Sequence, residues 1–223
     1  MAEKVTFSGF WWNYCTERYN REYRRVLMEL VEPNPEAAYL DLGCGDGKLA
    51  TKVASHIGTK YIHGVDVNVP LVHAKGIKFR KRDLDKGLSW YDNVFNVVTA
   101  SQIIEHVCDT DLLLKEIYRV LKPGGYADIS TNNLAAAHWI ILFLMGRQPP
   151  TACIGDEMYG TGKMHRRLFT MPGLVAAAKY FNFKIEQVVG TYYFPFPVPI
   201  ARMMCKIDRR HATCVTIKAR KPV

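Results

Sequence analysis

The chain has 223 residues, a formal net charge of +9 and a hydrophobic fraction of 48%. This length fits one large α/β domain, residues 1–223, which buries enough core to fold without disulfides. The six cysteines include no C-x-x-C pair, so they indicate neither a zinc site nor a disulfide framework, and reduced intracellular thiols are expected.

Neither a secretion signal nor a membrane span is expected. Residues 1–5 lack the apolar core of a signal peptide. The longest apolar run, from Leu134 to Met145, is shorter than the ~20 residues that a spanning helix needs. We therefore expect a cytoplasmic protein.

Strands and helices alternate along the chain. Strands are expected at 37–42, 61–67, 77–82, 95–100, 126–130, 183–189 and 213–219, and helices at 10–31, 48–57, 110–122 and 171–181. This alternation predicts a Rossmann-like three-layer α/β sandwich, in which helices cover both faces of a mostly parallel seven-stranded sheet. The last two strands lack a helical pattern between them, which predicts a C-terminal antiparallel hairpin.

The segment from Tyr39 to Lys48, YLDLGCGDGK, is the most informative in the chain. It predicts a buried strand, a tight turn with glycines at 43, 45 and 47, and the start of a helix. Glycine is required where the backbone takes a positive φ or passes close to a ligand. A helix N-terminus beside such a turn offers free N–H groups to a ligand, and α/β proteins bind nucleotide-like cofactors at this edge of the sheet.

The glycine spacing argues against a dinucleotide. The fingerprint G-x-G-x-x-G would require glycine at position 48, where Lys48 stands. The observed pattern is Asp41-x-Gly43-x-Gly45-x-Gly47. A nicotinamide-dependent dehydrogenase is therefore not expected.

Polar residues also follow the next three strands. After the second strand, Asp66-Val67 supplies a carboxylate that can accept both hydroxyls of a ribose. After the third, Asp83 can accept from an adenine amino group while Leu84 packs on the ring. Each of these acids alone could equally be an exposed surface residue. After the fourth strand comes SQIIEHV, from Ser101 to Val107.

Taken in order, these motifs resemble those of the Rossmann-like (class I) S-adenosylmethionine (SAM) dependent methyltransferases. The glycine turn resembles their motif I. The segments Ser101 to Val107 and Leu114 to Gly125 (LKEIYRVLKPGG) resemble the type 11 group, which includes ubiquinone-pathway and many secondary-metabolite enzymes. The likeness covers roughly residues 37–131 and continues weakly through Met164 to Thr170. It implies SAM as the cofactor and S-adenosylhomocysteine as the product.

The resemblance also implies which residues hold the cofactor. Asp41 would face the ammonium group of the methionine end, and Asp66 the ribose. The complete expected set is Asp41, Gly43, Cys44, Gly45, Asp66, Val67, Asp83, Leu84, Ser101, Gln102 and Tyr19.

Two segments are expected to cover this edge of the sheet. Residues 1–35 would form a helical lid whose aromatic residues (Trp11, Trp12, Tyr14 and Tyr19) contact SAM or simply pack on the sheet edge. Residues 134–182 would form an insertion over the substrate. Its apolar stretch Trp139 to Met145 is expected to be a buried helix; the alternatives are an acceptor pocket or a membrane-touching face.

Catalysis is less determined by the sequence. Methyl transfer depends mainly on alignment and desolvation, and a base is needed only if the acceptor must lose a proton. His106 is the first candidate and His165 the second; the alternatives are contact with the cofactor and loop packing. Tyr159, Tyr192 and Tyr193 either line the pocket or belong to the core or rim. No metal ligands are expected.

The expected function is transfer of the methyl group to an O, N or C atom of a small, partly apolar acceptor. One alternative is an RNA or protein methyltransferase that uses the basic surface. A second is a SAM-binding partner protein without turnover. The basic clusters are Lys75, Lys78, Arg80, Lys81, Arg82 and Lys86, and Lys206, Arg209, Arg210 and His211. Ser101 to Ile104 replaces the Asn/Asp-Pro-Pro-Tyr/Phe motif of base N-methylating enzymes, which argues against that class.

Overall fold

A seven-stranded sheet organises the computed structural model, which describes residues 9–68, 74–149 and 165–223. The strands are β1 (Ala38–Leu42), β2 (Tyr61–Asp66), β3 (Ile77–Lys81), β4 (Phe95–Ser101), β5 (Leu121–Asn132), β6 (Lys184–Thr191) and β7 (Cys214–Arg220). Their order is β3-β2-β1-β4-β5-β7-β6. Strands β1 to β5 are parallel, and β7 runs antiparallel to both of its neighbours. The predicted fold class is confirmed.

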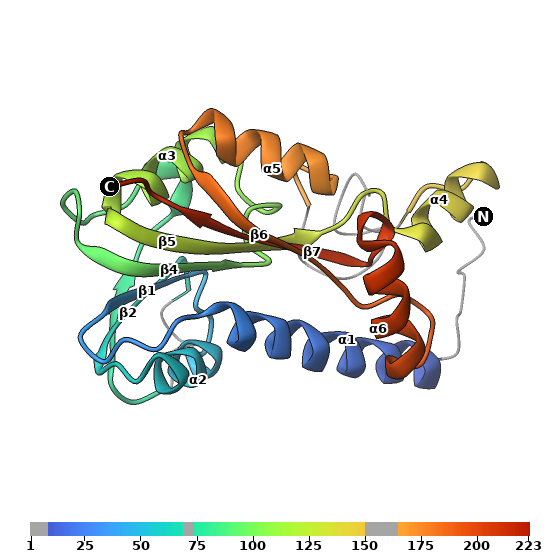
Figure 1. The fold of residues 1–223 in the computed structure, drawn as a ribbon, viewed down its shortest axis with the longest axis horizontal. Helices are drawn as coiled ribbons and strands as arrows, with labels where there is room; N and C mark the ends of the chain where they lie inside the picture. Colours follow the sequence, from blue (N-terminus) through green and yellow to red (C-terminus); the bar gives the residue numbers. More distant parts are fainter. Residues whose placement is uncertain (1–8, 69–73, 150–164) are drawn as a thin grey trace.

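Helices cover both faces of the sheet. They are α1 (Gly9–Leu30), α2 (Lys48–Ile57), α3 (Thr110–Val120), α4 (Ala137–Leu144), α5 (Met171–Tyr180) and α6 (Val198–Ile207), with short 3-10 helices η2 (Leu84–Lys86) and η5 (Arg209–His211). Figure 1 shows α1 and α2 on one face and α3 and α5 on the other. Helices α4 and α6 lie beyond the carboxyl ends of the parallel strands.

Local sequence signals explain several of these elements. Asp109 caps α3 by accepting a hydrogen bond from the Leu112 N–H at 2.8 Å, and Thr170 caps α5 by accepting one from the Gly173 N–H at 3.2 Å. The apolar stripe of α3 is buried between the helix and the sheet, as its spacing predicts. A separate apolar cluster fills the opposite face under α1 and α2.

The C-terminal strands are antiparallel as predicted, but the structure corrects two details: the connection between these strands and the start of β5. Strands β6 and β7 pair in antiparallel fashion, but α6 and η5 stand between them, so they are not joined by a tight hairpin. Pro197 precedes α6 and Pro199 lies in its first turn, where proline is compatible with a helix. Strand β5 begins at Leu121 rather than Tyr126, so residues 123–125 lie within it, beside a register irregularity opposite β4.

Helix α4 is not the buried helix expected from its composition. Trp139 is its one buried residue. Ile141, Phe143, Leu144 and the following Met145 have exposed fractions of 58%, 49%, 84% and 60%. Within the described ranges, no helix combines the length and the apolar character needed to cross a membrane.

A buried acid in the centre of the sheet makes stability depend on pH. Asp128 of β5 lies opposite Lys218 of β7, and neither of its carboxylate oxygens has a hydrogen-bond partner among the described residues. Burial raises the pKa of Asp128 to about 8, against the opposing effect of Lys218. Between the ordinary carboxyl pKa and this value, the folded chain holds a proton that the unfolded chain has released. Folding stability contributed by Asp128 therefore falls as pH rises through this window.

We expect Asp128→Asn to be more stable than the wild type at pH 8, because a neutral amide replaces a carboxylate that must ionise in the core. The pH slope of the free energy of unfolding should fall by as much as about 1.4 kcal/mol per pH unit. Denaturant unfolding between pH 5 and 9 measures this slope. Asp111→Asn, at an exposed acid, is the control and should behave as the wild type. An unchanged slope in Asp128→Asn would show that Asp128 does not titrate in this range.

Candidate functional site

The turn after β1 is fastened to the end of β2. The N–H groups of Gly43 and Cys44 both donate to the Val65 carbonyl, at 2.8 and 3.1 Å, and the Gly45 N–H donates to Asp66 Oδ2 at 3.0 Å. The glycines at 43, 45 and 47 have φ values of 69°, 53° and 75°. These left-handed conformations explain why the motif requires glycine. Helix α2 begins directly after the turn.

Two glycines of this turn have different surroundings. A Cβ atom built on Gly43 would lie 2.7 Å from Cδ1 of Ile103, in the loop after β4. A Cβ atom on Gly45 would meet no described atom within 4 Å. Gly43 therefore packs the turn after β1 against the loop after β4, whereas Gly45 faces open space beside Asp66. That opening fits a ligand that approaches the backbone closely.

Asp41 is a buried carboxylate at the end of β1, with an exposed fraction of 3%. Its Oδ1 accepts a hydrogen bond from the Thr99 hydroxyl at 2.6 Å. Burial raises the pKa of Asp41 to about 7, and the nearby Asp66 carboxylate contributes in the same direction. A positively charged group at this point would stabilise the ionised form.

The carboxylates of Asp66, after β2, and Asp83, after β3, each accept a backbone hydrogen bond within their own loop. Asp66 Oδ1 accepts from the Asn68 N–H at 2.9 Å, and Asp83 Oδ1 accepts from the Asp85 N–H at 3.1 Å, which starts η2. The Arg82 N–H donates to the Asp66 carbonyl at 3.0 Å, so these two loops are adjacent. Each carboxylate oxygen retains lone-pair capacity for a ligand.

Two other predicted cofactor residues, Cys44 and Leu84, turn their side chains inward. The thiol of Cys44 packs on β2, since a Cβ atom on Gly64 would lie 2.8 Å from its Sγ. Burial raises the pKa of that thiol to about 12. Leu84 is buried in the main core cluster, whereas Val67 is 55% exposed. Cys44 and Leu84 therefore offer a ligand their backbone or little side-chain surface.

Helix α1 is joined to the loop after β4 through Tyr19. The Tyr19 hydroxyl donates to Gln102 Oε1 at 2.9 Å, and the Gln102 amide donates to Ser130 Oγ and Cys214 Sγ, each at 3.3 Å. The hydroxyl of Ser101 is buried without a described hydrogen-bond partner. The side chain of Gln102 is thus committed to holding α1 against the sheet.

The remaining lid and pocket predictions have varied outcomes. The side chains of Trp11, Trp12 and Tyr14, and the whole of Tyr159, lie outside the described residues. Tyr192 and Tyr193 are buried in an apolar cluster with Ala201 of α6, so they belong to the core rather than to an open pocket.

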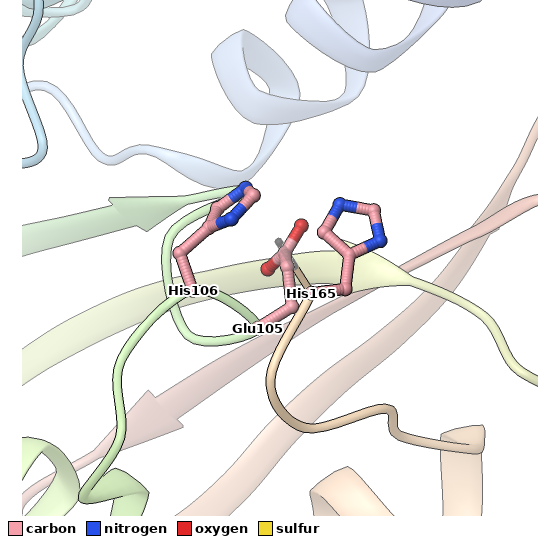
Figure 2. A group of neighbouring side chains, drawn as sticks. All are labelled: Glu105, His106 and His165. Carbon is pink, nitrogen blue, oxygen red and sulfur yellow. The ribbon is translucent and has the colours of Figure 1, made fainter. Parts of the chain in front are cut away.

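A carboxylate and two imidazoles gather beside the loop after β4. Figure 2 shows the Glu105 carboxylate between the rings of His106 and His165. The two ring centroids lie 4.8 Å apart. The Arg166 N–H donates to the Glu105 carbonyl at 2.7 Å, which fixes the segment that carries His165 against this loop. The structure thus brings together the two predicted catalytic histidines.

Glu105 is the site residue that sequence reasoning missed. Its side chain is fully buried, and Oε2 accepts from the Thr131 hydroxyl at 2.9 Å. Burial raises the pKa of Glu105 to about 7. The available signal was an acid adjacent to His106 in the segment after the fourth strand, but its proximity to His165 depends on the tertiary fold.

Known proteins resemble this chain in sequence and in fold. The family model described as "Methyltransferase domain" matches residues 15–188. The mitochondrial ubiquinone biosynthesis O-methyltransferase of Rattus norvegicus is 28% identical over 170 residues, which cover 70% of this chain and 47% of that protein. The demethylmenaquinone methyltransferase of Lactobacillus johnsonii is 36% identical over 118 residues, which cover 48% of each. This chain therefore spans about half the length of these two relatives.

Among solved structures, an S-adenosylmethionine dependent methyltransferase from Mesorhizobium loti has a TM-score of 0.66 at 18% identity. The match covers 91% of this chain and 99% of that one.

Proposed function

The chain belongs to the methyltransferase domain family, and from this premise we propose that it transfers the methyl group of SAM to a small, partly apolar acceptor. The cofactor supplies a methyl group already activated by its sulfonium. The observation that carries the proposal is the left-handed Gly45, which faces open space beside the carboxylate of Asp66. Dinucleotide cofactors are disfavoured by Lys48 at the third glycine position.

In this proposal, different residues around the opening bind different parts of SAM. Asp41 is the counter-charge for the ammonium group, and Asp66 accepts the ribose hydroxyls. Asp83 accepts from the adenine amino group. The backbone of the turn, with Val67, Ser101 and Tyr19, completes the site; Cys44, Leu84 and Gln102 contribute mainly through their backbones.

The acceptor binds on the side of His106 and His165. Two relatives are named for ubiquinone biosynthesis and for demethylmenaquinone. Helix α4, whose apolar residues are mostly exposed, lies at the same edge of the sheet. Both features favour an acceptor with an apolar part. Helix α1 acts as the lid, and the described residues 134–149 and 165–182 act as the substrate cover. The two histidines act on the reacting group of the acceptor, whose methylated atom is O, N or C.

The alternatives receive less support. Most of the first basic cluster lies on or beside β3, an edge strand, where charged residues commonly protect against sheet extension. Arg80 there donates to the Ser89 carbonyl, and Arg82 to the Gly87 carbonyl at 2.8 Å. These bonds give the cluster a structural role that requires neither RNA nor protein. A SAM-binding partner without turnover has no need for the two histidines beside Glu105.

Calorimetric titration with SAM tests this function, with NAD as the control ligand. We expect SAM to bind and NAD not to bind. Gly45→Ala should lower SAM affinity at least tenfold, because its methyl group enters the open space in front of the turn. Gly76→Ala is the matched control, since Gly76 is also left-handed, at φ +89°, with no described atom within 4 Å of a Cβ. Both variants carry about 1–2 kcal/mol of left-handed backbone strain.

Failure of the folded wild type to bind SAM would refute the proposal. If SAM binds, transfer of labelled methyl to hydroxylated aromatic compounds with apolar tails, to RNA and to protein separates the acceptor classes. Transfer to RNA or protein alone would favour the first alternative, and binding without transfer to any of them the second.

A further inference from the structure

The group formed by Glu105, His106 and His165 has the composition and geometry of a metal site. Each residue offers one ligand atom, and these atoms all lie within 4.8 Å of one another. Ligand atoms bound about 2.0–2.2 Å from a zinc ion lie roughly 3–3.5 Å apart. The observed arrangement is slightly more open, and small side-chain rotations would close it around an ion. In Figure 2 the carboxylate lies between the two rings.

The buried carboxylate provides an independent reason to expect a ligand. Glu105 is 0% exposed, and among the described residues its Oε1 has no hydrogen-bond partner. A buried polar atom without a partner destabilises the fold by about 1–3 kcal/mol, and more when it is charged. A cation held by both imidazoles would satisfy this oxygen.

The surroundings hold the carboxylate in position. Thr131 of β5 donates to Oε2 at 2.9 Å, which leaves Oε1 for the ion. The Arg166 N–H donates to the Glu105 carbonyl and fixes the chain beside His165. Hydrogen bonds of this kind orient metal ligands and tune their affinity.

We propose that Glu105, His106 and His165 bind a divalent transition-metal ion, and that this ion binds an oxygen atom of the methyl acceptor. Two imidazoles and one carboxylate form a ligand set used for catalytic zinc and for iron(II). Magnesium and calcium prefer oxygen ligands. Three protein ligands leave positions open for the acceptor, as catalytic metal sites require.

The ion gives the two histidines a defined role, and this inference rests on the proposed function. A hydroxyl bound to a divalent ion has a lowered pKa and loses its proton to solvent. The resulting oxygen anion forms the new bond to the methyl carbon, the carbon–sulfur bond breaks, and its electron pair stays on sulfur as a neutral thioether. The reaction needs no oxidant, and the proposal narrows the methylated atom to oxygen.

Metal binding is tested directly on the chelator-treated full chain. Calorimetric titration with Zn²⁺, Mn²⁺ and Mg²⁺, and the visible absorption of added Co²⁺, report binding without any turnover. We expect one zinc or manganese ion per chain, weaker binding of magnesium, and a Co²⁺ spectrum of a nitrogen- and oxygen-ligated site.

His165→Ala and Glu105→Gln should lower metal affinity by more than about 100-fold, because loss of an outer hydrogen-bond partner already lowers it 10–100-fold. Thr131→Val should lower it about tenfold for the same reason. His56→Ala, at an exposed histidine of α2, should retain one ion per chain. His165→Ala keeps the test valid if Glu105→Gln fails to fold.

Two outcomes would overturn the inference: no stoichiometric binding of any of these ions, or equal binding by the wild type and His165→Ala. Titration with SAM in the same samples separates this result from the proposed function. Binding of SAM without metal would refute the metal site alone, whereas binding of metal without SAM would refute the methyltransferase function.

Discussion

Replacing Asp66 by alanine should lower the affinity for SAM by at least about 100-fold. In the proposed complex this carboxylate accepts both ribose hydroxyls, and each hydrogen bond to a charged group is worth about 1.5–3 kcal/mol. The change also removes the acceptor of the Gly45 N–H and of the Asn68 N–H. The substitution therefore removes the direct contacts to the ribose and also weakens the glycine turn that binds the cofactor.

Calorimetry on Asp66→Ala, Asp66→Asn and Asp46→Ala measures this effect. Asn keeps one oxygen acceptor, so its loss of affinity should be intermediate. Asp46 stands in the same turn, but its side chain pairs with Lys48 at 2.7 Å, so removing it should change affinity less than about threefold. Unchanged binding in Asp66→Ala would mean that another residue holds the ribose.

Replacing Gly43 by alanine should destabilise the fold and remove SAM binding together. The alanine would have to adopt φ +69°, and its methyl group would lie 2.7 and 2.9 Å from two carbons of Ile103. Left-handed strain of about 1–2 kcal/mol adds to overpacking of about 1–3 kcal/mol. We expect a loss of about 2–5 kcal/mol in the free energy of unfolding, measured by denaturant.

A double-mutant cycle identifies the cause. Ile103→Ala removes the two closest carbons, so Gly43→Ala should be less destabilising in that background by about 1–3 kcal/mol. Gly76→Ala reports the strain alone. Additive effects of Gly43→Ala and Ile103→Ala would contradict the proposed clash.

The sequence predicted those parts of the fold that depend on local rules. Glycines at 43, 45 and 47 indicate left-handed backbone because other residues adopt it with strain, and the three φ values confirm this. Asp109 and Thr170 predict helix starts because their side chains cap free N–H groups. Alternation of strands and helices predicts a parallel sheet, because neighbouring parallel strands must be joined by a crossover connection, which is usually a helix.

The parts that were missed depend on tertiary contacts. Prolines at 195, 197 and 199 obscure α6, whose short helical pattern is stabilised by packing on Tyr192 and Tyr193. Composition alone predicts burial for α4, but a short apolar run carries no information about what covers it. The group around Glu105 was missed because His165 reaches it from a segment far along the chain, and spacing rules for metal ligands apply to neighbouring residues.

The contact between Gly43 and Ile103 has a consequence for how two ligands bind. Ile103 stands two residues before Glu105, so one loop borders both the cofactor turn and the proposed ion site. A loop adjustment caused by one ligand would therefore change the affinity for the other. Because the four binding steps form a closed thermodynamic cycle, SAM must alter the affinity for the ion by the same factor as the ion alters the affinity for SAM. The order of addition can then change the rate of assembly, but not the stability of the ternary complex.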